Sequence, residues 1–138
     1  MNIKDEEAML AAGNKLAAQL KPGMVVFLVG NLGAGKTTLV RGILRGLGHS
    51  GAVKSPTYNI VEPYSINEQS VFHFDLYRLM DVEELEYMGI RDYLTDDSIC
   101  FIEWPEKGDG LLPKPDIQIE IKINGSEREL LVSSSLEL

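Results

Sequence analysis

Apolar residues recur at helical spacing near the start of the chain. Within residues 5–20, steps of three and four residues separate Met9, Ala12, Leu16 and Leu20. This spacing places the apolar side chains on one face of a helix. Acidic residues at the beginning suit the positive end of a helix dipole, and Lys21-Pro22-Gly23 is a stop signal. The pattern predicts an amphipathic helix over residues 5–20.

A continuous apolar run follows, without polar alternation. Residues 24–29 read MVVFLV, which is typical of a strand covered on both faces in a parallel sheet. The run ends at Gly30 in a glycine-rich segment. A second helical pattern begins at Lys36 and stops at Gly48, and its apolar face holds Leu39, Val40, Ile43, Leu44 and Leu47. Strand, loop and helix come in the order that a nucleotide site requires.

The middle of the chain predicts two strands joined by a turn. Residues 58–64 and 70–75 flank the turn-rich segment SINEQ. In the second strand, Val71, His73 and Asp75 alternate with two phenylalanines. Because His73 alternates with apolar neighbours, a structural role is favoured for it over a role in binding.

A further helix is indicated from Asp81 onward. Glu84 lies three residues later and completes an acidic variant of the capping box. Met80 and Leu85 are placed to form a hydrophobic staple across the first turn. Gly89 follows the segment, so we expect the helix to end there.

The last third of the chain predicts three more strands. Residues 98–103 read as a buried strand, and a loop containing WPEKGDGLLPKPD leads to residues 116–123, whose strict alternation is typical of a half-exposed strand. Asn124-Gly125 predicts a tight hairpin to residues 127–133. We therefore expect a single α/β domain over residues 1–138, with a mixed, mostly parallel sheet flanked by helices and a C-terminal antiparallel hairpin.

Composition agrees with one domain of ordinary globular type. The chain is 44% apolar and 25% charged, and its length leaves no room for separate cofactor and substrate domains. The longest apolar run is far below the roughly 20 residues that cross a bilayer, and the N-terminus lacks the apolar stretch of a signal peptide. We expect a cytoplasmic protein without a membrane partner. The single cysteine, Cys100, excludes an internal disulfide and is interpreted as a buried spacer.

The charge balance bears on possible nucleic-acid partners. Thirteen Lys and Arg residues against twenty-one Asp and Glu residues give a net charge of -8. Affinity for polynucleotides comes from clustered cations that displace counterions, and the sequence has no such cluster. We therefore expect no DNA binding and no direct grip on RNA, although an acidic surface would suit a basic partner protein.

The glycine-rich segment carries the strongest motif in the chain. Residues 30–37, GNLGAGKT, match the phosphate-binding pattern G-x-x-x-x-G-K-[ST] at every specified position. Glycines let backbone N–H groups turn toward a polyphosphate, and the following helix adds its N-terminal donors. Lys36 is expected to bridge the β- and γ-phosphates, and Thr37 to bind Mg²⁺. The expected nucleotide-binding residues of this segment are Asn31, Leu32, Gly33, Ala34, Gly35, Lys36, Thr37 and Thr38.

Two carboxylates are candidates for a position beside the metal. Asp75 and Glu103 each end an apolar strand, so both should emerge at the carboxyl edge of the sheet, where open α/β sheets bind ligands. Either one is a candidate to hold Mg²⁺, while the other, more readily Glu103, would orient the attacking water. The sequence lacks the N-K-x-D string of guanine-specific proteins, which favours adenine by default. Arg78 and Arg91 are candidate cations for the transition state.

Taken together, five strings resemble the bacterial TsaE family, also called YjeE. They are GNLGAGKTT at 30–38, VKSPTY at 53–58, HFDLYRL at 73–79, ELEYMGIRDY at 84–93 and IEWPEKG at 102–108. The resemblance covers most of the chain. It implies a small P-loop ATPase that uses ATP and Mg²⁺ and is required for threonylcarbamoyladenosine modification of tRNA. It also implies TsaD and TsaB as partner proteins, with tRNA contacted only indirectly.

The resemblance further implies roles for individual residues. Lys36 and Thr37 match the phosphate lysine and the magnesium hydroxyl, and Asp75 matches the Walker B aspartate. Ser55 and Thr57 match a switch-like loop near the γ-phosphate, which makes Thr57 a catalytic candidate. Glu103 matches a glutamate associated with Mg²⁺ and activity, and Trp104 matches a tryptophan near the nucleotide pocket. Without the resemblance, a lone tryptophan at a strand end is more often part of the core.

Three functions remain open from the sequence. The first is a slow ATPase that acts on partner proteins and is stimulated by them. The second is a nucleotide-gated binding module whose hydrolysis is incidental, and Glu103 discriminates between these two. The third is a small-metabolite kinase, for which the chain offers little length for an acceptor pocket and an arginine-bearing lid.

Overall fold

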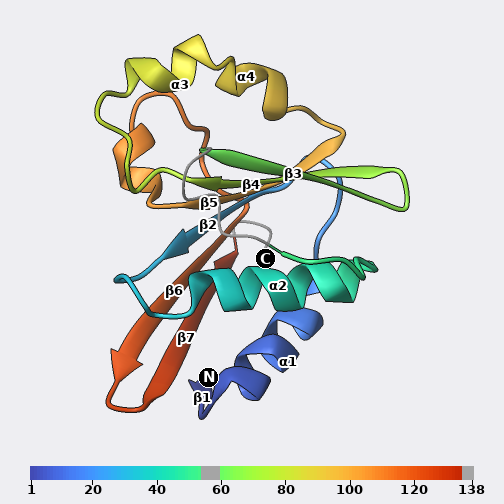
Figure 1. Cartoon of the computed structure of the whole chain (residues 1–138), viewed down its shortest axis with the longest axis vertical. Helices are drawn as coiled ribbons and strands as arrows, with labels where there is room; N and C mark the ends of the chain where they lie inside the picture. The colour runs from blue at the N-terminus through green and yellow to red at the C-terminus, as the bar shows by residue number, and fades with distance from the viewer. Residues whose placement is uncertain (54–59, 135–138) are drawn as a thin grey trace.

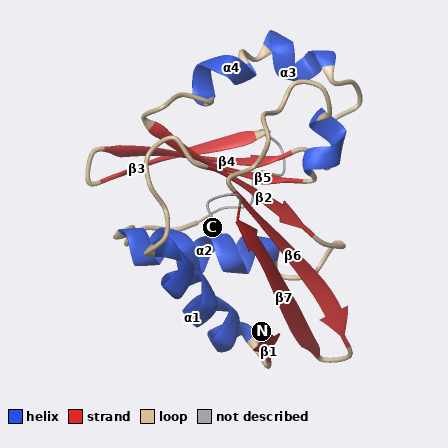
Figure 2. Cartoon of the chain, turned by 180° about the vertical axis from the view of Figure 1, so that it is seen from behind, coloured by secondary structure: helices blue, strands red, loops and turns tan. Residues whose placement is uncertain are grey.

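In the computed structural model, one twisted sheet lies between two helical layers (Figure 1). The structure describes residues 1–53 and 60–134. Helices α1 (Glu6–Ala17) and α2 (Lys36–Leu47) cover one face of the sheet, and α3 (Glu83–Tyr87) and α4 (Ile90–Tyr93) cover the other (Figure 2). Helices on both faces leave the central strands buried, as the continuous apolar runs predict.

The sheet has seven strands in the order β1-β7-β6-β2-β5-β4-β3. Their bounds are β1 (Asn2–Ile3), β2 (Val25–Val29), β3 (Val61–Ile66), β4 (Gln69–Asp75), β5 (Ser98–Glu103), β6 (Ile117–Asn124) and β7 (Glu127–Ser134). Strand β2 pairs in parallel with β5 and β6, and β5 pairs in parallel with β4. The predicted mixed sheet with a C-terminal antiparallel hairpin is confirmed. The structure adds an antiparallel pair at the other edge, β3 with β4, and the short strand β1, which was not anticipated.

Alternation along the strands separates two cores. Val26 and Leu28 of β2 pack against α1 and α2, in one cluster with Leu39 and Ile43. On the other face, Val25 shares a cluster with Leu85 and other residues beneath α3 and α4. Both faces of a central strand are therefore apolar, which is why this strand shows no polar alternation.

Helix α1 begins as predicted and ends three residues early. The side chain of Asp5 caps it by accepting a hydrogen bond from the Ala8 N–H at 2.9 Å. Residues 18–20 do not continue the helix, because their N–H groups bond to carbonyls three residues back instead of four. Such bonds tighten the last turn of a helix, here just before Pro22.

Helices α1 and α2 approach each other closely at glycines. A Cβ atom placed on Gly42 would lie 2.4 Å from the carbonyl oxygen of Leu10, and one on Gly13 would lie 2.5 Å from the carbonyl oxygen of Leu39. The backbones can meet at this distance only where side chains are absent. The crossing fixes α2 on the sheet, and thereby fixes its N-terminus at the glycine-rich loop.

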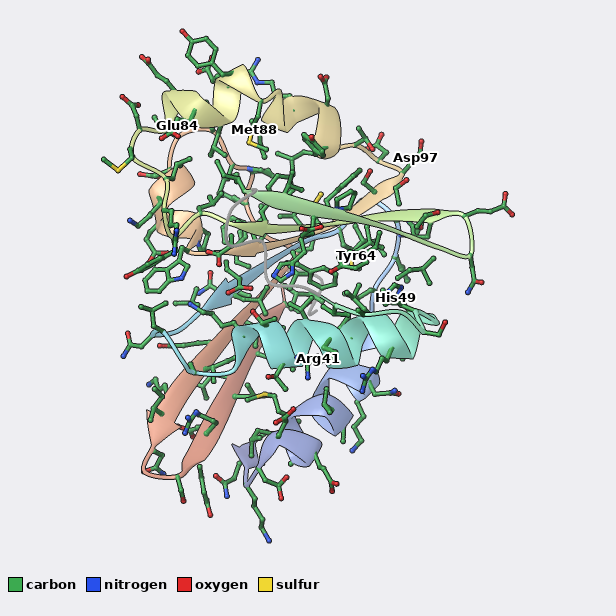
Figure 3. The ribbon with its side chains drawn as sticks, viewed as in Figure 1. Arg41, His49, Tyr64, Glu84, Met88 and Asp97 are labelled. Atoms are coloured by element: carbon green, nitrogen blue, oxygen red, sulfur yellow. The ribbon has the colours of Figure 1, made fainter. Side chains whose placement is uncertain are left out.

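The far end of α2 is tied to the edge of the sheet. His49 follows Gly48, whose φ of 114° makes it the predicted left-handed stop of α2. The His49 ring meets Tyr64 of β3 edge-on, with centroids 5.1 Å apart (Figure 3). Arg41, on the outer side of α2, pairs with Glu6 at 3.3 Å. This pair is partly exposed and contributes little to stability.

Around α3, two of the three local predictions are confirmed. Glu84 accepts hydrogen bonds from the N–H groups of Met80 and Asp81, and the Asp81 side chain accepts one from the N–H of Glu83. Gly89, with φ 76°, ends the helix. The hydrophobic staple is wrong, because Met80 is 91% exposed while Leu85 is buried. The backbone N–H of Met80 donates a hydrogen bond to the Glu84 carboxylate, and the Met80 side chain lies in solvent.

Two other details differ from the prediction. The C-terminal hairpin turns at Gly125-Ser126, one residue later than expected, because Asn124 already pairs with Glu127. Gly125 supplies the positive φ of 65° that such a turn requires. The first residues of the predicted strand 58–64 lie outside the described residues, and the described strand begins at Val61. No helix in the described part of the chain is long and apolar enough to cross a bilayer.

Candidate functional site

Three strand ends meet at one edge of the sheet. Strand β5 lies between β2 and β4, and all three run in parallel. Glu103, the last residue of β5, is in register with Leu28 of β2 and with Asp75, the last residue of β4. Because the carboxyl ends of parallel strands share an edge, the two predicted carboxylates and the glycine-rich loop after β2 are brought together.

The glycine-rich loop connects β2 to α2 with backbone that only glycine adopts easily. Gly33 has φ 79° and Gly35, the N-cap of α2, has φ 108°. Side chains are strained at such angles. The first N–H groups of a helix have no partner within it, so those of α2 face the same opening as the loop. Backbone donors and the positive end of the helix dipole make this a suitable place for a phosphate group.

Lys36 begins α2 and is buried, with 5% of its surface exposed. Its ammonium donates a hydrogen bond to the carbonyl oxygen of Gly30 at 2.5 Å and lies 3.9 Å from the centroid of the Trp104 ring. Burial lowers the pKa of Lys36, and the negative charges of Glu103 and Asp75 oppose this shift. The Lys36 ammonium is therefore a partly desolvated cation beside two carboxylates, and its charge interactions are screened less than they would be in water.

Glu103 is almost completely buried, with 3% of its surface exposed. Its Oε2 atom accepts a hydrogen bond from the hydroxyl of Thr37 at 3.4 Å and lies 2.6 Å from Nε2 of His73. A carboxylate in such a position needs donors around it. Glu103 therefore joins α2, β4 and β5 through one side chain.

Asp75 lies beside Glu103 and is less buried. Its Oδ1 accepts a hydrogen bond from the N–H of Tyr77 at 3.0 Å. Burial raises the pKa of Asp75, the charge of Glu103 adds to the rise, and the Tyr77 hydrogen bond opposes it. A carboxylate whose ionisation is opposed by burial and by a neighbouring negative charge favours a cation beside it.

Trp104 follows β5 in an unusual conformation. Its φ of 57° is left-handed, which is rare for a bulky residue and costs about 1–3 kcal/mol. Such strain clusters at functional sites. The ring is held between the Lys36 ammonium and Tyr77, whose ring centroid is 5.0 Å away. The structure thus places Trp104 at the site, where it lines the cleft and also packs against the margin of the core.

A cleft of about 730 Å³ opens between these elements. Most of the residues predicted from the sequence line it: Leu32, Gly33, Gly35, Lys36, Thr37, Thr38, Asp75, Glu103 and Trp104. Ala34 is buried and lines a smaller neighbouring cavity of about 180 Å³. Asn31 is exposed at the start of the loop and lines neither cavity. Thr57 and Ser55, predicted near the γ-phosphate, lie outside the described residues.

Sequence reasoning missed several residues of the site. Tyr77, Ile60 and Glu84 line the cleft and were not among the predicted site residues. Of the two arginines predicted as candidate cations, Arg78 lines the cleft and Arg91 lies on α4. Arg128 of β7 donates hydrogen bonds to the carbonyl oxygens of Ala34 at 3.1 Å and Gly33 at 3.4 Å, so the hairpin holds the glycine-rich loop. No local signal points to Arg128, because its contact depends on the position of β7 in the sheet.

The oxygen atoms at the edge of the cleft suit a hard divalent cation. Thr37 and Glu103 are in contact, and Asp75 is the next residue along the edge. Among residues 1–53 and 60–134, no three His, Cys, Asp or Glu side chains form a complete cage for a metal. Mg²⁺ does not require one, because it usually binds one or two carboxylates together with water and substrate phosphates. The residues present therefore fit Mg²⁺ held jointly with a phosphate ligand.

These features define an α/β protein with a phosphate-loop sequence at the carboxyl edge of its sheet. Residues 3–130 match the family described as threonylcarbamoyl adenosine biosynthesis protein TsaE. The chain belongs to the TsaE family. One relative is the tRNA threonylcarbamoyladenosine biosynthesis protein TsaE of Haemophilus influenzae. It is 53% identical, and the match covers 97% of this chain and 89% of the relative. That of Bacillus subtilis is 39% identical over 90% of this chain and 78% of the relative.

A solved structure agrees with the sequence comparison. The crystal structure of Bacillus subtilis YdiB superimposes with a TM-score of 0.82 over 97% of this chain and 83% of that chain, at 31% sequence identity. This similarity supports the predicted fold class as well as the predicted family.

Proposed function

We propose that the protein binds ATP with Mg²⁺ and hydrolyses it in support of threonylcarbamoyl transfer to adenosine in tRNA. One observation carries the proposal: Lys36 and Thr37, at the start of α2, face Asp75 and Glu103 across a single cleft. Phosphoryl transfer depends on positioning and charge neutralisation, and these four residue types supply both. The absence of a guanine-specific string favours adenine as the base.

Each side chain has a distinct task in the proposed reaction. Backbone N–H groups of the loop and of α2 hold the phosphate oxygens, and Lys36 neutralises charge that grows on the γ-phosphate. Mg²⁺ would be held by Thr37 with one of the two carboxylates, and it would supply further charge neutralisation. The remaining carboxylate, more readily Glu103, orients the attacking water and accepts its proton.

Glu103→Gln separates binding from hydrolysis. The substitution keeps the shape of the side chain and removes its negative charge, so ATP binding should persist while turnover falls by about 100-fold or more. Calorimetry measures the binding, and phosphate release measures the turnover. Glu129→Gln, at an exposed position of β7, is the control with the same loss of charge. Full turnover by the Glu103 variant would favour the nucleotide-gated binding module, in which hydrolysis is incidental.

We further propose that the protein acts on a transferase formed by TsaD and TsaB and contacts tRNA only through it. The family resemblance suggests these partners, and the net charge of -8 suits docking on a protein more than on an RNA. No sequence motif marks an arginine finger in this chain, so hydrolysis by the isolated protein should be slow. Adding TsaD and TsaB should raise ATP turnover. A fast rate that partners leave unchanged would contradict the proposal.

A further inference from the structure

Within residues 1–53 and 60–134, the side chain of His73 on β4 makes one hydrogen bond, and its partner is Glu103 of the site. Its side chain is fully buried, and its Nε2 atom lies 2.6 Å from Oε2 of Glu103. A carboxylate oxygen only accepts hydrogen bonds, so Nε2 carries the hydrogen and donates it. This arrangement fixes which ring nitrogen is protonated when Glu103 is ionised.

The sheet register explains why the two side chains meet. Alternate residues of a strand share a face, so His73 and Asp75 lie on the same face of β4. Glu103 is in register with Asp75 on the neighbouring strand, which places His73 one diagonal step behind it. The contact therefore joins two adjacent strands in the interior of the sheet and does not depend on a loop.

The second ring nitrogen of His73 bears on why a histidine, and not an apolar residue, occupies this position. Nδ1 of His73 is buried and has no hydrogen-bond partner among the described residues. Buried polar atoms are normally paired, and an exception asks for an explanation. An apolar side chain would fill this part of the core without leaving a polar atom unpaired. The imidazole is therefore best explained by what it does for Glu103.

The geometry at Glu103 shows what that contribution is. His73 and Thr37 both contact the same oxygen, Oε2. A carboxylate is a rigid planar group, so holding one oxygen from two sides sets the position of the other. Glu103 lines the cleft, and its orientation there follows from these two contacts.

We propose that His73 is a positioning residue that holds the Glu103 carboxylate in the orientation required at the triphosphate site. The proposal rests on the proposed ATPase function and extends it to a residue behind the site. Partners of this kind orient a reactive side chain, and their loss typically lowers metal affinity or activity by about 10- to 100-fold. His73 itself is not among the residues that line the cleft.

Two polar substitutions of His73 test the proposal. In His73→Gln the amide nitrogen reaches the position of Nε2, whereas in His73→Asn the amide is too short to reach Glu103. We expect His73→Asn to lower kcat by about 10- to 100-fold with little change in KM for ATP, and His73→Gln to recover most of the loss. Equal kcat values for the two variants would overturn the proposal. Thermal unfolding compares their folding.

Combining the substitutions asks whether His73 acts through Glu103. In a Glu103→Gln background, His73→Asn should lower the residual turnover by less than twofold. A loss as large as in the wild-type background would overturn the proposal, because the effect of His73 would then not pass through Glu103.

A measurement on the metal-free protein needs no activity. Nitrogen NMR of the two histidine rings, assigned with His49→Gln, should show a hydrogen on Nε2 of His73 whose signal shifts in Glu103→Gln. An unprotonated Nε2 would overturn the proposal. Wild-type protein that binds no ATP would overturn the proposed function together with the positioning role. If the wild type hydrolyses ATP and His73→Asn hydrolyses it at the same rate, the positioning role alone would be overturned.

Discussion

Glu103 and Asp75 end adjacent strands and differ in their hydrogen-bond partners. Glu103 is held by a hydroxyl and an imidazole, whereas Asp75 accepts one backbone hydrogen bond and has a raised pKa. Both carboxylates were predicted from strand ends in the sequence. Their partners were not, because the His73 contact depends on the register of β4 against β5, which a single sequence does not specify.

The raised pKa of Asp75 predicts a cost in stability. Its pKa in the folded state lies above the ordinary 3.8, so the folded protein binds this proton more tightly than the unfolded chain. Stability is then favoured below the unfolded pKa and falls as pH rises through the folded pKa. Without metal, Asp75→Asn should have a higher free energy of unfolding than wild type at pH 7.5, and the difference should shrink toward pH 4.

Urea unfolding in the presence of a chelator measures this difference. Asp109→Asn, at an exposed position, controls for the change of one charge. A variant at Asp75 that is less stable than wild type at pH 7.5, or a difference that grows toward low pH, would contradict the interpretation. The same variant should bind Mg²⁺ and ATP more weakly, which is the usual exchange between stability and function.

Cys100 was predicted to be a buried spacer, and the structure confirms its burial. Its side chain is 1% exposed and its thiol donates a hydrogen bond to the carbonyl oxygen of Tyr93 at 3.4 Å. Burial raises the pKa of the thiol to about 12. Because the thiolate is the reactive form, the folded protein should not react with a thiol reagent at pH 8. Rapid stoichiometric labelling under native conditions would contradict this, and unfolding in urea should restore it.

At the scale of elements, the helices were predicted better than their contacts. The glycine-rich loop and the start of α2 follow from a local motif, and α2 begins at Lys36 as expected. The end of α1 and the exposure of Met80 depend on Pro22 and on the Glu84 carboxylate, which compete with the simple periodicity. The clamp from Arg128 onto the loop joins residues 94 apart in the chain, beyond the reach of any local pattern.

The crossing of α1 and α2 gives a prediction at this scale. A methyl group at Gly42 would lie 2.4 Å from a backbone oxygen of Leu10, so Gly42→Ala must push the helices apart. We expect a loss of about 1–3 kcal/mol in the free energy of unfolding, as for other overpacked sites. Gly51→Ala is the control, because among the described residues its added methyl would meet a side chain, the His49 ring at 3.2 Å, and no backbone atom. Equal stability of the two variants in urea unfolding would contradict this packing.

At the scale of the whole molecule, the site is built from segments spread along the chain. The loop after β2, the end of β4 and the end of β5 converge because β5 lies between the other two strands. The sequence predicts such an edge from the order of apolar strands and from where the acidic residues fall. It does not predict the position of β7 beside the loop, because that position depends on long-range pairing. The antiparallel β3–β4 pair is local, since Ile66 pairs with Gln69 across a two-residue turn.

The central claim is that the cleft at this edge binds ATP with Mg²⁺, and calorimetry tests it most directly. Wild-type protein titrated with ATP in the presence of magnesium should bind one nucleotide per chain. Lys36→Met should abolish this binding, because it removes the only ammonium among the cleft-lining residues of the described structure. Lys122→Met, at an exposed position of β6, should bind as wild type does. No heat of ATP binding from folded wild-type protein, or full binding by Lys36→Met, would contradict the account.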